Sequence, residues 1–157
     1  MIGDRSNRHA KEMPTRCAFY TFASLAGGAT LTNLGGFAGV LINANGEQTF
    51  LSLFVPHDFR KLKHLCLVLI PREANPAMTI RTVCNFAHDG EVYTTHSKTL
   101  DHTFIAALDV VQEIDLTALL DTLIVPLHHN DYIGIEVTRV AGQNTNAMVL
   151  GIRLRYL

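Results

Sequence analysis

Charged side chains are scarce in this chain. Of its 157 residues, only 17% are Asp, Glu, Lys or Arg, whereas an average soluble domain has roughly 25%. The formal net charge of −1 excludes a strong basic field for binding nucleic acid. Apolar residues make up 48% of the chain, so the shortage of charge indicates that a partner covers part of the surface.

Tryptophan is absent, and there are only three cysteines, Cys17, Cys66 and Cys84. An odd number of widely spaced cysteines excludes a disulfide framework. Cys66 and Cys84 each lie inside an apolar run, which predicts small buried hydrophobic side chains in a reduced protein. Eight Phe and four Tyr supply all the aromatic side chains.

Long apolar runs are missing as well. No stretch reaches the ~20 residues that a helix needs to cross a bilayer, so we expect no membrane contact. Residues 17–29 follow four basic residues and superficially resemble a secretory signal. However, Asp4 and Glu12 dilute the basic region, and we assign no signal peptide.

The first 46 residues differ in character from the rest. Residues 1–16 are polar and carry both charge signs, as an arm does, whereas residues 17–46 hold no charge and six of the eleven glycines. We predict that 1–46 is an assembly segment covered by neighbouring subunits, because its apolar side chains would otherwise form an exposed patch. The alternative, that 17–46 supplies the first strands of the same domain, stays open, with 37–43 as the candidate strand.

Residues 47–157 are predicted to form the folded domain. Runs 48–55 and 64–70 each end before a proline, and 78–88 alternates apolar with polar side chains. Asp89 and Gly90 predict a two-residue type I′ hairpin that pairs Phe86 with Tyr93 and Cys84 with Thr95.

The chain after residue 100 continues in short strands. We expect a strand over 104–114 that breaks near Asp109, a helical turn over 115–123 capped by Asp115, and strands over 132–140 and 147–156. About eight antiparallel strands with almost no helix predict an all-β protein, a single jelly-roll β-sandwich with one short helical turn. The expected core of the closing strands is Ile133, Ile135, Leu150, Ile152 and Leu154.

Three stretches carry a resemblance to a known family. They are Phe-Val-Pro-His-Asp-Phe at 54–59 with the apolar run 65–71, residues 86–97, and residues 131–137 joined to 149–156. Together they resemble short jelly-roll proteins found among phage and other viral structural proteins, over 47–157. The resemblance implies a jelly roll with a structural role, often in trimeric or larger assemblies, and supplies no catalytic residues.

Eight histidines raise the question of a metal site. His128 and His129 are adjacent and would point to opposite faces of an extended chain. The chain has no H-x-H, H-E-x-x-H or C-x-x-C motif, and it lacks the His-x-His and Glu of cupins. We therefore predict no metal and no cofactor. The remaining histidines of the domain are His57 and His64 around one turn, and His88, His96 and His102 around one hairpin.

Catalytic motifs are also missing. There is no G-x-S-x-G elbow, the glycines of 27–39 lack phosphate-loop spacing, and capping accounts for Asp115. We predict no catalytic residue and no enzymatic activity. The residues weighed were the serines Ser24, Ser52 and Ser97, the carboxylates Asp89, Glu91, Asp109, Glu113 and Asp115, and the basic groups Arg60, Lys61, Lys63 and, in the arm, Arg5, Arg8 and Lys11.

These expectations lead to a virion structural protein, a capsid, decoration or fibre subunit made in the host cytoplasm. Its partners would be copies of itself, with a trimer favoured, and other virion subunits; only the basic arm would contact nucleic acid. The alternative is a carbohydrate- or receptor-binding jelly-roll module. We rank it second because sugar sites need exposed aromatic rings beside polar side chains, and this chain has no Trp and places most Phe on strand faces.

Overall fold

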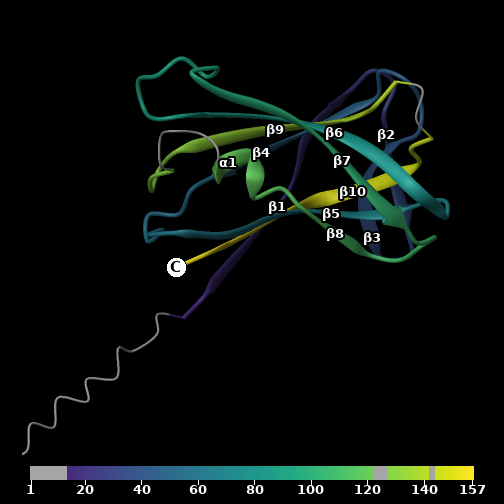
Figure 1. Cartoon of the computed structure of the whole chain (residues 1–157), viewed down its shortest axis with the longest axis horizontal. Helices are drawn as coiled ribbons and strands as arrows, with labels where there is room; N and C mark the ends of the chain where they lie inside the picture. The colour runs from purple at the N-terminus through teal and green to yellow at the C-terminus, as the bar shows by residue number, and fades with distance from the viewer. Residues whose placement is uncertain (1–13, 122–126, 142–143) are drawn as a thin grey trace, which may run out of the picture.

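The computed structural model describes residues 14–121, 127–141 and 144–157, which form a sandwich of two antiparallel β-sheets with one turn of helix (Figure 1). The all-β jelly-roll prediction is confirmed, with ten strands in place of about eight. The elements are β1 (Arg16–Ala26), β2 (Thr30–Leu34), β3 (Phe37–Ile42), β4 (Gln48–Phe54), β5 (Leu62–Pro71), β6 (Asn75–Ala87), β7 (His96–Ala106), β8 (Gln112–Asp115), α1 (Ala118–Asp121), β9 (Tyr132–Arg139) and β10 (Ala147–Tyr156).

We name the two sheets after their central strands. In the β10 sheet, β5 runs along one side of β10, β3 and the first half of β1 run along the other, and β2 and β8 form the edges. The β9 sheet has the order β1, β4, β9, β6, β7. Strand β1 serves both sheets, because an irregularity between Phe22 and Ser24 turns it from β10 to β4.

The main core fills the space between the sheets. Along β9, Ile133, Ile135 and Val137 point inward and are almost fully buried, and Ile152 and Leu154 of β10 meet them from the other sheet. These core predictions are confirmed. Leu150 is also buried, but it lies on the outer face of the β10 sheet, because the pairing shifts between Val149 and Gly151 and reverses the alternation.

Residues before position 47 belong to this same sandwich. β1 hydrogen-bonds to β10 and β4, β3 hydrogen-bonds to β10, and Val40 and Ile42 are fully buried in the main core. The expected boundary between residues 46 and 47 is therefore not a structural boundary, since the uncharged segment supplies three strands. Its contact with a neighbouring subunit stays a prediction, and residues 1–13 lie outside the described residues.

The hairpin between β6 and β7 differs from the prediction. Phe86 pairs with His96 and Cys84 with Lys98, so the connection is the longer loop of residues 88–95. Gly90 has a positive φ of 86°, but Asp89 does not, which rules out a type I′ turn. The reason lies in Glu91, whose backbone N–H and carboxylate both bond to the backbone of His88 and close a turn at the base of the loop.

The connection from β7 to α1 agrees with the prediction. Asp109 has a positive φ of 58° where the strand was expected to break, and the Asp115 carboxylate accepts the N–H of Thr117 at 2.8 Å. Leu116, Leu119 and Leu120 are buried, while Leu123 lies outside the described residues. As expected, Cys66 and Cys84 are buried free thiols; Cys17 is exposed.

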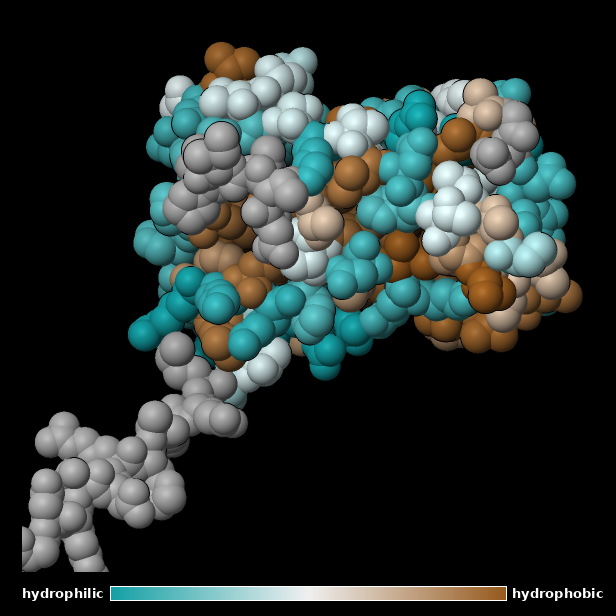
Figure 2. Space-filling view, in the orientation of Figure 1, coloured by the Kyte–Doolittle hydropathy of each residue, from teal (hydrophilic) through white to brown (hydrophobic). Residues whose placement is uncertain are grey.

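Apolar side chains gather on the surface around the β7–β8 turn, at the end of the sandwich opposite the β6–β7 loop (Figures 1 and 2). Ile105, Leu108, Val110 and Val111 are all exposed there. None of the helices in the described part of the chain is long and apolar enough to span a membrane.

Candidate functional site

The outer face of the β9 sheet, which we call the open face, is the surface where the side chains best suit ligand binding. Strand alternation sends Thr49, Leu51 and Leu53 of β4 into the core, so Phe50, Ser52 and Phe54 point outward. The same alternation along β9 turns Tyr132, Gly134 and Glu136 outward, and β6 and β7 extend the face on the far side.

The strand register arranges these residues in rows across the sheet. Ser52, Gly134, Asn85 and Ser97 form one row, which is about 14 Å long because neighbouring strands lie ~4.8 Å apart. On one side of this polar row lie Phe54, Tyr132 and Ala87. On its other side lie Phe50, Glu136, Val83 and Thr99, and beyond them Gln48, Thr138, Arg81 and Asp101.

Phe54 and Tyr132 form an exposed aromatic pair beside the polar row. Their ring centroids are 5.4 Å apart with an interplanar angle of 57°, and the residues are 41% and 61% exposed. The hydroxyl of Tyr20 donates to the carbonyl of Phe54 at 2.6 Å and holds the backbone there. The pair therefore presents ring surface to solvent from a fixed position on two central strands.

Charged groups on the open face pair with protein partners. Arg81 donates two hydrogen bonds to Asp101 at 2.7 and 2.8 Å, which lowers the pKa of that carboxyl below its ordinary value. Gln48 donates to Glu136 at 2.6 Å. Among the described residues, no protein group hydrogen-bonds to the side chains of Ser52, Asn85, Ser97 or Thr99. The groups left for a ligand are thus neutral donors and acceptors.

Gly134 sits in the middle of the polar row. A Cβ built there would approach nothing closer than the carbonyl of Asn85 at 4.0 Å. The fold therefore has room for a side chain at this position, and the lack of one leaves open space between Ser52 and Asn85.

Comparisons with known proteins bear on the fold alone. No protein-family model matches the chain, and no curated protein is significantly similar to it. A solved structure that matches over most of both chains is the family 11 carbohydrate-binding module of a cellulosomal cellulase of Clostridium thermocellum. It has a TM-score of 0.51 and 12% identity, over 94% of this chain and 91% of that one.

Two longer enzymes contain a similar unit. The isomalto-dextranase of Arthrobacter globiformis, complexed with panose, matches with a TM-score of 0.52 and 17% identity, over 89% of this chain and 23% of its own. The exo-β-1,3-galactanase of Phanerochaete chrysosporium, with galactose, matches with a TM-score of 0.51 and 13% identity, over 92% of this chain and 30% of its own. This chain thus spans less than a third of either enzyme.

The virion role expected from the sequence is wrong. The three solved structures described above are a carbohydrate-binding module and two carbohydrate-acting enzymes, and none of them is a capsid, decoration or fibre protein. The expectation rested on a resemblance in three stretches, whose physical content is a tight hairpin, a short helical connection and a closing strand pair. Such features specify a jelly roll and are compatible with many functions.

Carbohydrate binding was ranked second for want of exposed aromatic rings beside polar side chains, and Phe54 is such a ring. Phe54 lies on a strand, as expected, but on the outward parity, and the register with β9 places it beside Tyr132. Ser52 and Ser97, weighed as nucleophiles, lie in the polar row of this face. Asp109 and Glu113 form ion pairs with Arg72 and Arg153, respectively.

The rings of three histidines lie close together, and two of them, His88 and His96, were expected around one hairpin. The ring of His88 lies 5.6 Å from that of His96 and 5.1 Å from that of His128, centroid to centroid. Its hydrogen bond to Asp131 raises the pKa of His88. The sequence signal was the spacing H-x2-E-x4-H from His88 to His96, which none of the common motifs contains.

The other weighed residues lie elsewhere. His102 is half-buried with its ring nitrogen 2.8 Å from the hydroxyl of Thr82, and burial lowers its pKa. A cleft of about 480 Å³ lies between His57, Arg60 and the ion pair of Arg16 with Asp58. Its one Phe, Tyr or Trp lining residue among the described residues, Phe59, is buried, so the cleft offers a ligand no exposed benzene or indole ring.

Proposed function

We propose that this protein is a non-catalytic carbohydrate-binding module that holds a neutral oligosaccharide against the open face. The observation that carries the proposal is the exposed pair of Phe54 and Tyr132 beside the row of Ser52, Gly134, Asn85 and Ser97. The sandwich fold, shared with a family 11 module over most of both chains, supports the architecture that the proposal requires.

The match is chemical. A pyranose ring has an apolar face of C–H groups and a rim of hydroxyls. The rings of Phe54 and Tyr132 suit the apolar face, since aromatic surface pairs with C–H groups. Hydroxyl and amide side chains both donate and accept, so Ser52, Asn85 and Ser97 suit the rim. The row is long enough for more than one sugar unit.

The pairing of two carboxylates on the open face supports binding without hydrolysis. Glycosidases need one carboxyl group kept protonated as an acid, with a raised pKa. The pKa of Asp101 is lowered by Arg81, and Glu136 accepts a hydrogen bond from Gln48. Both groups therefore suit structural pairing. Self-association into trimers stays a separate prediction that this function neither needs nor excludes.

A glycan array tests the proposal directly. The chain should bind at least one class of neutral oligosaccharide, and Tyr132→Ala should weaken that binding about tenfold, which corresponds to ~1.4 kcal/mol. Phe37→Ala is the matched control, because Phe37 is an exposed aromatic on the other sheet and its loss should leave binding unchanged. Binding of no neutral glycan, or equal losses in both variants, would contradict the proposal.

A further inference from the structure

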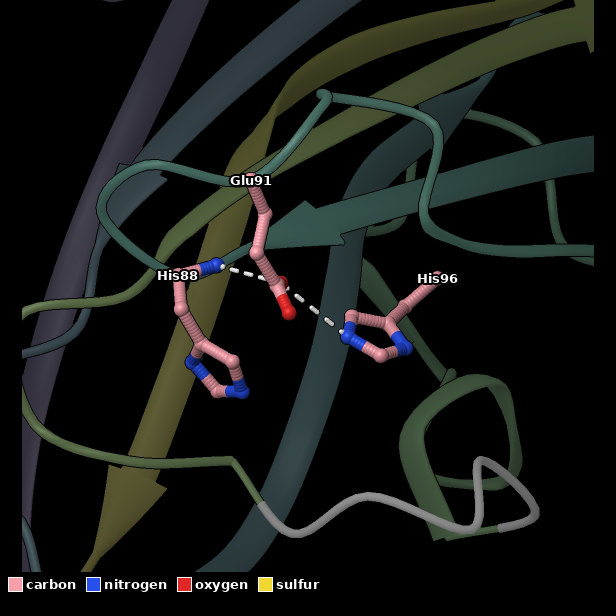
Figure 3. Close-up of side chains that lie close together, drawn as sticks. All are labelled: His88, Glu91 and His96. Carbon is pink, nitrogen blue, oxygen red and sulfur yellow. Dashed lines mark hydrogen bonds and ion pairs between the residues drawn. The ribbon is translucent and has the colours of Figure 1, made fainter.

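A second cluster of polar side chains lies at the loop end of the sandwich (Figure 3). His88 follows the end of β6, Glu91 lies in the loop of residues 88–95, and His96 begins β7. Each of the three offers a ligand atom, and these atoms all lie within 4.8 Å of one another. Figure 3 shows the Glu91 carboxylate between the two imidazole rings.

Packing fixes two of these groups before any ligand arrives. The ring of His96 stacks on the buried ring of Phe86, with centroids 4.4 Å apart and planes 19° apart, and its side chain is only 13% exposed. The Glu91 carboxylate accepts the backbone N–H of His88 at 3.0 Å and lies 3.2 Å from Nε2 of His96. A preorganised cluster loses little freedom when it binds an ion.

Asp131 sets the orientation of His88. Its side chain is 4% exposed, with Oδ2 accepting the N–H of His128 at 2.6 Å and Oδ1 lying 2.5 Å from Nδ1 of His88. An ionised carboxylate only accepts, so Nδ1 carries the proton and the lone pair of a neutral His88 is on Nε2. A carboxylate behind the ring is the usual support of a metal-binding histidine.

We propose that His88, Glu91 and His96 bind a divalent transition metal of the zinc type, with Asp131 as a positioning residue. Two imidazoles and one carboxylate are a ligand set that zinc uses, with a fourth position left for water. Imidazole nitrogen favours zinc, nickel and copper over calcium and magnesium, which take oxygen ligands. The proton that His96 holds on Nε2 toward Glu91 would move to Nδ1, so the ring binds as its other neutral tautomer.

Asp131 also belongs to an overlapping group with His88 and His128. Both of its oxygens already accept hydrogen bonds from those two residues. Metal binding through Asp131 would break the bond that orients His88. The geometry therefore places the ion on the Glu91 side of the His88 ring.

A metal ion at this site would crosslink the loop of residues 88–95 to the β9 sheet. The ion would join the loop, which carries exposed Val92 and Tyr93, to the first residue of β7. A ligand that binds only the folded state stabilises it in proportion to the logarithm of its concentration over Kd. This inference does not depend on carbohydrate binding.

Titration calorimetry of the untagged full chain with zinc chloride and calcium chloride provides the test. We expect one zinc ion per chain, no calcium binding, and at least a tenfold loss of zinc affinity in Glu91→Gln and His96→Ala, a ~1.4 kcal/mol effect. His64→Ala is the matched control, because His64 is exposed on β5 and outside the cluster. Glu91 is exposed, so Glu91→Gln should leave the fold intact even if His96→Ala does not.

X-ray absorption of the zinc-loaded chain gives a readout that needs no variant. It should show only nitrogen and oxygen neighbours near 2.0–2.1 Å, and no sulfur near 2.3 Å. Absence of saturable zinc uptake, preference for calcium, sulfur ligation, or unchanged affinity in Glu91→Gln would each overturn the proposal.

Discussion

The outer faces of the two sheets differ in burial: side chains that point outward are buried on the β10 sheet and exposed on the β9 sheet. On the β10 sheet, Val68, Ile70, Met148 and Leu150 are buried and pack as a second, smaller core with Leu34. On the β9 sheet, the outward-pointing positions of the central strands hold exposed aromatic rings and small polar side chains. One outer face thus contributes to stability, whereas the other is exposed to solvent.

Two glycines make the contrast concrete. A Cβ on Gly151, on the outer face of β10, would lie 2.3 Å from the carbonyl of Tyr20 and 2.7 Å from the ring of Phe19. A Cβ on Gly134 would meet only Asn85, at 4.0 Å. Packing therefore requires glycine at position 151, whereas no packing contact requires it at position 134.

The largest expected effect is on stability at the buried outer face. Ile70 is 1% exposed, so Ile70→Ala should cost ~2–5 kcal/mol, as should Ile152→Ala in the main core. Tyr132→Ala on the open face should cost under about 1 kcal/mol, since the ring is largely exposed. Urea denaturation measures all three. A cost below ~0.5 kcal/mol for Ile70→Ala would remove the distinction between the faces.

The two glycines should respond differently to one added methyl group. Gly151→Ala should destabilise the protein by ~1–3 kcal/mol, because the methyl has no room and the backbone must shift. Gly134→Ala should be neutral or stabilise by about 0.5–1 kcal/mol, since glycine weakens a strand interior. Thermal unfolding measures the change in stability of both variants. Equal destabilisation would show that Gly134 is also a packing position.

Thiol labelling probes the same difference with the smallest disturbance to the fold. Cys66 lies on the outer face of the β10 sheet, and burial raises its pKa, so little thiolate forms at pH 8 and alkylation should be slow. In a Cys17→Ser background, Ser52→Cys on the open face should react at the rate of a free thiol. Burial also raises the pKa of Cys84, to about 12, so the Cys84 thiol should not be alkylated. Rapid labelling of Cys66 would mean that the β10 face opens readily.

Much of the fold could be predicted from the sequence, but the strand pairing could not. Alternation and prolines located β4, β5, β6, β9 and β10, because local patterns determine individual strands. The candidate strand 37–43 coincides with β3, whereas β1 and β2 were missed because the uncharged segment around them, interrupted by glycines, shows no clear alternation. The hairpin at Asp89 and Gly90 was misread because the bonds between Glu91 and His88 override the dipeptide signal.

The candidate sites depend on long-range register. Phe54 and Tyr132 are 78 positions apart, and only the pairing of β4 with β9 brings their rings together. His88 meets Asp131 in the same way, from loops 43 positions apart. The lack of Trp and the placement of most Phe on strand faces ranked carbohydrate binding second. Composition does not report adjacency on the sheet, which brings the rings of Phe54 and Tyr132 together beside the polar row.

The most direct test of the open face is the affinity of Gly134→Val for the glycan that the array selects. Valine suits a strand, and a Cβ at position 134 approaches no contact closer than the carbonyl of Asn85 at 4.0 Å, so we expect the variant to keep the stability of the parent chain. Its side chain would stand between Ser52 and Asn85 and block the polar row, and calorimetry should show a loss of at least tenfold, or ~1.4 kcal/mol. A stable Gly134→Val protein that binds the glycan with unchanged Kd would contradict the account.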